Sequence, residues 1–349
     1  MRFIRCVVAV LAAMAIALTA VPPSAHAASV PATRVRLCSL PSAVPAGVER
    51  IGGADRFEVA VRVSQEAFPA GASVVFLASG ANYADALTGS ALAGNLGGPV
   101  LLVTRDSVPT SVRDEIVRLS PGSIVILGGP ASVSNSLERS LAYLPASVER
   151  IAGADRYAGA VAVARAFSFI PVDVMYVASG EGFADALSAS PAAGSWGVPV
   201  LLTTRTALPD PVRVLLAEQD ALEQIVVVGG PATVSDSVVG ALAQYAPVKR
   251  VEGIDRYAVS AQISSREFCD RLPRVYIASG ENFPDALAGS VAAIQSGGPV
   301  LLVTRNSIPS AVATELRRLK PQHIRVLGGA NTVSDTVVAA LDEFVHELK

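Results

Sequence analysis

The chain has 349 residues, of which 51% are hydrophobic and 17% are charged, and its formal net charge is -2 at pH 7. Lysine and arginine are scattered rather than clustered, which argues against nucleic acid or an anionic membrane as the partner. A chain of this length can form more than one domain.

Residues 1–27 have the pattern of a secretory signal peptide. Two arginines precede an apolar run over 6–20, and a small-x-small cleavage site ends at Ala27. A transmembrane anchor fits less well, because the run is short and two prolines end it. We expect export, with residues 28–47 as a spacer. Because neither a later span nor a Leu-Pro-x-Thr-Gly sorting signal is found, the protein would stay on the cell by non-covalent binding.

After the spacer the sequence alternates helix and strand patterns. The expected elements of the first module are a helix over 56–68, a strand over 74–78, a helix over 84–96, a strand over 100–103, a helix over 109–119, a strand over 124–127, a helix over 134–143 and an extended segment over 148–151. The strands are continuously apolar, which is typical of strands buried on both faces. The alternation therefore predicts a parallel sheet with right-handed crossovers.

The same landmarks return at a spacing of one hundred residues, so the chain is one module used three times. The pattern Gly-x-Asp-Arg-aromatic occurs at 53–57, 153–157 and 253–257. A double glycine closes the units at 128–129, 229–230 and 328–329. We expect an α/β fold of three tandem modules, each with a parallel sheet flanked by helices, packed as a pseudo-threefold assembly. The expected modules cover 48–146, 147–247 and 248–349.

Repeated polar residues follow the expected strands. Since the carboxyl ends of parallel strands share the edge at which such folds bind ligands, these side chains should lie along one rim. The candidate polymer-binding residues are Asp55, Arg56, Asp85 and Arg105 in the first module, Asp155, Arg156, Asp185 and Arg205 in the second, and Asp255, Arg256, Asp285 and Arg305 in the third.

These residues allow two interpretations that can hold together. In the structural one, the first aspartate of each module caps a helix, and the adjoining arginine forms a salt bridge to the second aspartate of the same module. In the binding one, the arginines present bidentate donors to an anionic or polyhydroxylated polymer.

Enzymatic and cofactor functions find little support in the sequence. Neither glycine-rich phosphate-binding motif is present, which disfavours nucleotides. Asp55 and Asp85 could act as a glycosidase pair, but neighbouring arginines would keep both acids ionised. After residue 27 the histidines are His323 and His346, and neither has a counterpart in the other modules, which argues against a zinc amidase or a Ser-His-Asp hydrolase. We expect no cofactor and no metal.

Cys38 and Cys269 are the cysteines that remain after signal removal. In an oxidising compartment they could form a disulfide between the spacer and the third module, or they could stay unpaired. The sequence leaves both open.

With these motifs the chain resembles the cell wall binding repeat type 2 family. The motifs of the first module are Arg50-Ile51-x-Gly53-x-Asp55-Arg56-Phe57, Ala78-Ser79-Gly80, Asp85-Ala86-Leu87, Gly98-Pro99-Val100-Leu101-Leu102 and Val125-Ile126-Leu127-Gly128-Gly129. Their counterparts recur in the other two modules. Val100 departs from the isoleucine that is usual in the Pro-x-Leu-Leu motif.

The resemblance implies non-covalent anchoring to the wall of Gram-positive bacteria through three repeats packed as a pseudo-trimer. The implied ligand is an anionic secondary wall polymer. Members usually carry an effector domain as well, and we expect none in these 349 residues.

The expected function is thus that of a secreted, non-catalytic protein of the cell wall or cell surface that binds an anionic, teichoic-acid-like wall polymer. One alternative is a wall-glycan hydrolase that uses the acids of one module. The other is a surface protein that assembles through protein–protein contacts. A hydrolase should show catalytic groups gained in one module, and an assembling protein should self-associate without wall material.

Overall fold

The structure is a computed structural model, and it describes residues 37–38, 46–167 and 172–347. The expected signal peptide and most of the expected spacer lie outside these residues. Among the described helices, none has the length and apolar character needed to cross a membrane.

Helices and strands alternate along all three modules. The first contains β1 Gly47–Ile51, α1 Arg56–Ala67, β2 Val74–Ser79, α2 Ala84–Asn95, β3 Val100–Val103, α3 Thr110–Leu119, β4 Ser123–Leu127 and α4 Asn135–Ser140. The second contains β5 Ser147–Ile151, α5 Arg156–Ala166, β6 Val174–Ser179, α6 Ala184–Trp196, β7 Val200–Thr203, α7 Asp210–Ala217, β8 Gln224–Val228 and α8 Asp236–Leu242. The third contains β9 Val248–Val251, α9 Arg256–Glu267, β10 Arg274–Ser279, α10 Pro284–Ser296, β11 Val300–Val303, α11 Ser310–Leu319, β12 His323–Leu327, α12 Asp335–Leu341 and the 3-10 helix η1 Asp342–Phe344.

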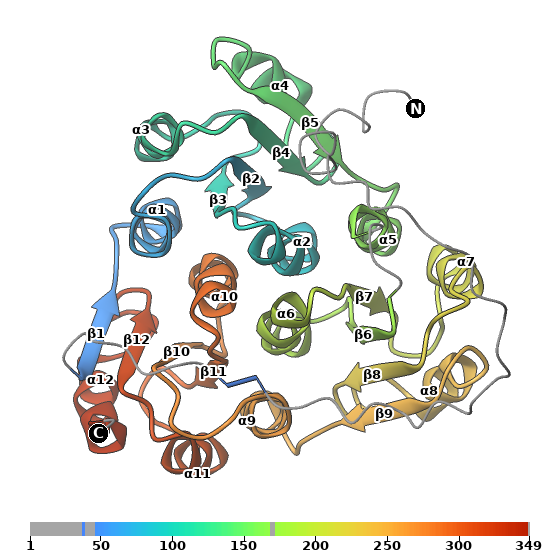
Figure 1. Cartoon of the computed structure of the whole chain (residues 1–349), viewed down its shortest axis with the longest axis vertical. Helices are drawn as coiled ribbons and strands as arrows, with labels where there is room; N and C mark the ends of the chain where they lie inside the picture. Colours follow the sequence, from blue (N-terminus) through green and yellow to red (C-terminus); the bar gives the residue numbers. More distant parts are fainter. Residues whose placement is uncertain (1–36, 39–45, 168–171, 348–349) are drawn as a thin grey trace, which may run out of the picture. The chain divides into compact units, whose positions relative to one another are not determined.

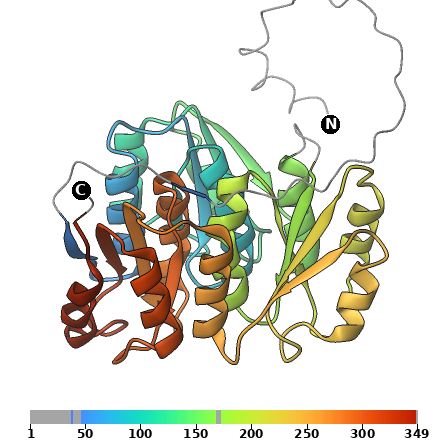
Figure 2. The same cartoon turned by 60° about the horizontal axis from the view of Figure 1, so that its bottom comes forward.

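The described strands form three four-stranded, parallel sheets, which confirms the predicted fold class. Their strand orders are β3-β2-β4-β5, β7-β6-β8-β9 and β1-β12-β10-β11. The central strands are buried on both faces, as their continuous apolar runs predicted. Helices α2, α6 and α10 lie inside the ring of sheets, and α3, α7 and α11 lie outside it (Figure 1). Strands and helices run along roughly one direction (Figure 2).

The first strand of each module joins the sheet of another module. Strand β5 completes the first sheet, with Ile151 opposite Leu127, and β9 completes the second. Strand β1 pairs with β12, so that Ile51 lies opposite Leu327 and the ring closes. The three modules are therefore interlocked by main-chain hydrogen bonds as well as by packing.

The helix predicted over 134–143 is shorter in the structure. Helix α4 begins after a Ser134 cap and ends at Ser140, with Leu141 at its C-terminal cap. The chain must then turn back within a few residues to enter β5 at Ser147, and Pro145 disfavours a longer helix.

Helices α2, α6 and α10 pack against one another on the pseudo-threefold axis. The Ser190 hydroxyl donates a 2.9 Å hydrogen bond to the Leu87 carbonyl, so α2 and α6 approach closely. Near their last turns, Gly94 and Gly194 leave room for the side chain of Ile294, which a Cβ at either glycine would overlap. Gly94, Gly194 and Ile294 are equivalent positions of the three helices. Three isoleucines would overlap there and three glycines would leave a void, so close packing requires one large residue and two small ones.

The contact between the third and first modules contains a charged cluster. Arg325 is 7% exposed and pairs with Glu49 at 2.8 Å and with Glu66 at 2.7 Å. At the end of α9, Leu37 forms a parallel β-bridge with Phe268, and Cys38 forms a disulfide with Cys269, with the two Cα atoms 5.1 Å apart.

Candidate functional site

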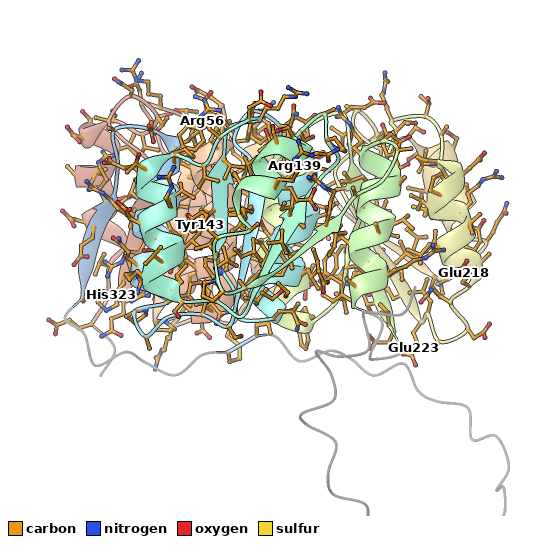
Figure 3. The ribbon with its side chains drawn as sticks, turned by 90° about the horizontal axis from the view of Figure 1, so that it is seen from above. Arg56, Arg139, Tyr143, Glu218, Glu223 and His323 are labelled. Atoms are coloured by element: carbon orange, nitrogen blue, oxygen red, sulfur yellow. A yellow bond between two sulfur atoms is a disulfide. The ribbon has the colours of Figure 1, made fainter. Side chains whose placement is uncertain are left out.

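The candidate residues that follow β1, β5 and β9 lie at the carboxyl-terminal edge of the sheets. In Figure 3 Arg56, which follows β1, lies at one edge of the ring, while His323 and Glu223, at the starts of strands, lie at the opposite edge. Parallel strands place all their carboxyl ends together, so the loops of all three modules share this edge.

The first aspartate of each repeated motif caps a helix. We call Asp55, Asp155 and Asp255 the motif aspartates. Asp55 Oδ1 accepts hydrogen bonds from the backbone N–H groups of Phe57 and Glu58, both at 2.9 Å. Asp155 caps α5 through the two equivalent N–H groups, and Asp255 caps α9 through the Ala258 N–H. The motif aspartates are exposed, so they also present carboxylate to the solvent.

The adjoining arginines are anchored by a backbone carbonyl. We call Arg56, Arg156 and Arg256 the motif arginines. Each donates from Nη1 to the carbonyl of the glycine that ends the next strand of its module, and the Arg256 bond to Gly280 measures 2.6 Å. Arg156 Nη1 also donates to the Tyr83 hydroxyl at 3.1 Å, and all three residues stay exposed. A guanidinium has five donors, so most remain available for a ligand.

The second aspartate of each module is largely buried. We call Asp85, Asp185 and Asp285 the seam aspartates. Burial raises the pKa of each of them, while a hydroxyl hydrogen bond and a nearby arginine act in the opposite direction. The hydroxyls belong to Ser132, Thr233 and Thr332.

The double glycine makes room for the seam aspartate. Gly128 has a φ of 99°, and a Cβ there would lie 2.8 Å from the Asp85 Cγ atom. Gly229 and Gly328 have the same left-handed backbone and the same carboxylate contact. Only glycine satisfies both conditions, which explains the repeated Gly-Gly pattern.

The arginine near each seam aspartate comes from another module. The positive charge of Arg156 lowers the pKa of Asp85. Arg256 has the same effect on Asp185, and Arg56 has it on Asp285. The expectation of a salt bridge between the two residues within one module is therefore wrong. The physical reason is the strand exchange, which brings each Asp-Arg motif to the sheet edge of its neighbour.

We call the three surfaces where these residues meet seam 1–2, seam 2–3 and seam 3–1, after the modules that form them. Seam 3–1 contains a cavity of about 310 Å³, and seam 1–2 contains one of about 220 Å³. The residues that line both include the double-glycine loop and seam aspartate of one module with the Gly-Ala-Asp-Arg segment of the next. Each cavity thus offers a buried carboxylate, an exposed carboxylate and a guanidinium to one ligand.

An aromatic residue of each module meets the others on the axis, and the sequence analysis missed this cluster. The rings of Tyr83, Phe183 and Phe283 have centroids 5.5–6.2 Å apart. Arg156 lies over the Tyr83 ring at 5.6 Å, and Arg256 lies over the Phe183 ring at 5.5 Å. The sequence feature that could have predicted the cluster is an aromatic residue two positions before each seam aspartate. The cluster thus contacts two of the three motif arginines, Arg156 and Arg256.

The remaining candidates lie apart from the two cavities. We call Arg105, Arg205 and Arg305 the loop arginines. Arg105 pairs with Asp106 at 3.1 Å, and both side chains are more than half exposed. The loop arginines do not line either cavity. Among the described residues, no group of three or more His, Cys, Asp or Glu side chains could hold a metal ion.

The repeated motifs agree with a known family. A family model for Cell wall binding domain 2 (CWB2) matches residues 50–138, 150–239 and 250–338. The chain belongs to this family. The three matches correspond to the three modules that form the seams, so each seam lies between two CWB2 repeats.

Two relatives from Bacillus subtilis (strain 168) share this region. The N-acetylmuramoyl-L-alanine amidase LytC is 26% identical over 294 residues, which cover 84% of this chain and 58% of that protein. An amidase enhancer is 29% identical over 297 residues, which cover 85% of this chain and 40% of that protein. The chain therefore spans about half the length of the curated relatives it matches.

A solved structure has the same fold. Cwp6 from Clostridium difficile superposes with a TM-score of 0.82 at 25% identity, over 87% of this chain and 48% of that one. The similarity extends over all three repeats, so the ring of modules is a shared architecture.

Proposed function

We propose that this protein is exported and attaches non-covalently to an anionic secondary polymer of the bacterial cell wall, without catalysing a reaction. Membership of the CWB2 family supports a wall partner. The Cys38–Cys269 disulfide supports export, because disulfides persist in oxidising compartments.

The observation that carries the proposal is that a seam aspartate of one module and a motif arginine of the next line the same cavity at seams 3–1 and 1–2, and that the arginine lowers the pKa of the aspartate at all three seams. A wall polymer with charged groups offers two kinds of recognition element. Its anionic groups suit the free donors of the guanidinium, and its sugar hydroxyls suit carboxylate acceptors. Three such seams on one edge can engage a repetitive polymer together, which raises the avidity above the affinity of any single seam.

Binding suits the geometry better than glycan hydrolysis does. The raised pKa of a seam aspartate is the direction that a general acid requires. Its partner carboxylate, however, is a motif aspartate whose Oδ1 is already engaged as a helix cap by one or two backbone N–H groups. The same arrangement recurs in all three modules, and none gains a further catalytic group. We therefore expect no release of reducing ends when the protein is incubated with purified walls.

The test is sedimentation of the chain without residues 1–27 with purified walls, before and after mild acid extraction of the secondary polymers. Binding should fall strongly after extraction and return when the released polymer is reattached. Equal binding to stripped peptidoglycan would overturn the polymer assignment. Reducing ends released above the level of a protein-free control would overturn the non-catalytic assignment.

A further inference from the structure

The three seams share the aspartates and arginines described above, but they differ in the residues around them. The differences fall at the two positions after Ser79-Gly80 and its equivalents, in the double-glycine loop, and at the two positions that flank the first glycine of the Asp-Arg motif. These positions decide which uncharged and charged groups an incoming ligand meets first.

Amide side chains are concentrated at seam 3–1. Asn282 and Asn331 both line its cavity, both are exposed, and neither amide has a hydrogen-bond partner among the described residues. Seam 1–2 has one equivalent amide, Asn82, with Ala131 at the other position. Seam 2–3 has none, since the equivalents are Gly182 and Ala232. The capacity for neutral hydrogen bonds to sugar groups therefore falls from seam 3–1 to seam 2–3.

Additional carboxylates are most numerous at seam 2–3. At seam 1–2, Glu181 follows β6 and adds to the rise in the pKa of Tyr157 that burial causes. At seam 2–3, Glu281 acts in the same way on Tyr257, and Glu252 adds a second exposed carboxylate.

Seam 3–1 has no acid at these positions, because Ala81 and Gly52 occupy them. It has one carboxylate of its own, Glu58, which accepts a 2.7 Å hydrogen bond from the Ala54 N–H and lies 3.9 Å from Arg62. Arg62 lies opposite Glu58, and Glu252 of seam 2–3 likewise lies 3.8 Å from Arg250, so in the described part of the chain the acids that distinguish the other seams without an ion pair are Glu181 and Glu281.

An apolar side chain also marks seam 2–3. Ile254 stands between the glycine and aspartate of the motif and is 99% exposed. Its equivalents, Ala54 and Ala154, line the cavities of the other two seams. A branched side chain at this entrance narrows the approach to Asp255 and Arg256.

We infer that the seams are not equivalent and that seam 3–1 is the principal binding site for the anionic polymer. This inference rests on the proposed function. Seam 3–1 combines the shared arginine with two free amides and the smallest repulsion of an anion, and seam 2–3 combines the same arginine with two extra acids and no amide. Seam 2–3 contributes little to the affinity for the polymer.

The experiment exchanges the charges of two seams. Gly52→Glu with Ala81→Glu gives seam 3–1 the acids of seam 2–3, and Glu252→Gly with Glu281→Ala gives the reverse. A side chain at Gly52 meets only ordinary contacts at 3.5 Å or more. The matched control, Ala70→Glu with Ser147→Glu, adds the same charge to exposed positions near the starts of β2 and β5.

The probe is the polymer released from walls by mild acid, in short fragments, titrated calorimetrically at low salt. Wild type should bind one fragment per chain strongly. The first variant should lose about tenfold in affinity, because two like charges are brought within a few ångströms of the ligand. The second should strengthen the weak binding at seam 2–3 by about tenfold, and the control should stay within about twofold of wild type.

The possible failures point to different conclusions. Three equal sites in wild type, or an equal effect of the first variant and the control, would overturn the ranking of the seams while leaving polymer binding intact. If wild type binds neither the fragments nor polymer-bearing walls, the proposed function itself fails. A double change of Asn282→Ala and Asn331→Ala should also weaken binding by about tenfold, whereas Asn135→Ala, an exposed asparagine on α4, should not.

Discussion

The packing of α2 on β4 allows a direct test of whether side-chain volumes in the core are matched. Gly89 lies on α2 against Leu127 of β4, and a Cβ at position 89 would overlap the Leu127 Cδ1 atom and lie 3.0 Å from Cδ2. The third module repeats this pair as Gly289 and Leu327. The second module has alanine and valine at the equivalent positions. Its larger helix residue is thus matched by a smaller strand residue.

We predict that Gly89→Ala destabilises the protein and that Leu127→Val rescues it. Alanine in a helix interior should add about 0.5–1 kcal/mol to the free energy of unfolding. The overlap with a fully buried leucine should cost about 1–3 kcal/mol, so the net loss is about 1–2 kcal/mol. Leu127→Val alone should cost about 0.5–1.5 kcal/mol, since it removes one methylene from the core.

The double variant should be close to wild type, because the valine leaves room for the new methyl group. The coupling free energy between the two sites is then about 2 kcal/mol. Equilibrium denaturation of the four proteins in guanidinium chloride measures it. A coupling below about 0.5 kcal/mol would refute the volume argument. The reverse pair in the second module, Ala189→Gly with Val228→Leu, provides an independent cycle.

Three further predictions concern the seam aspartates, the arginines and the disulfide. Changing the seam aspartates to asparagine should raise thermal stability at pH 7 but weaken wall sedimentation. Because burial raises their pKa above 3.8, their ionisation costs stability as the pH rises through the folded-state value, so the difference in Tm should vanish as the pH falls towards 4. Changing the motif arginines to alanine should weaken wall binding more than the same change in the loop arginines. The loop variant should lose affinity mainly at low salt. Unchanged affinity of the loop variant would assign the loop arginines a structural role. Cys38→Ser should lower the free energy of unfolding by about 2–4 kcal/mol relative to the oxidised protein and match the wild type measured with reductant.

Much of the fold could be predicted from the sequence because local pattern and tertiary structure agree. The continuous apolar run at 74–78 can only be buried on both faces, and Asp55 is followed by a helical pattern that needs a cap. Each of these signals sits within a dozen residues and recurs three times. A weak local pattern that recurs three times is reliable, so the predicted ends of the helices and strands lie within a few residues of those in the structure.

The arrangement of the site could not be predicted in the same way. The extended segment at 148–151 has no feature that says which sheet it joins, since its backbone could pair with either neighbour. Once β5 pairs with β4, Arg156 must face Asp85 and not Asp185. The error in the expected salt bridges thus came from one undetermined strand partner.

Because β1 pairs with β12, the contact between the third and first modules is of the same kind as the other two, and the fold does not depend on which module begins the chain. A circularly permuted chain that begins at Ser147 and joins the end of the third module to Gly47 by a linker would contain the same three junctions. The number of modules, in contrast, is set by the trio of helices on the axis. A chain of two modules would leave one sheet without its fourth strand and one flank of the axial helices exposed to water. The ring therefore tolerates new chain termini but not the loss of a module.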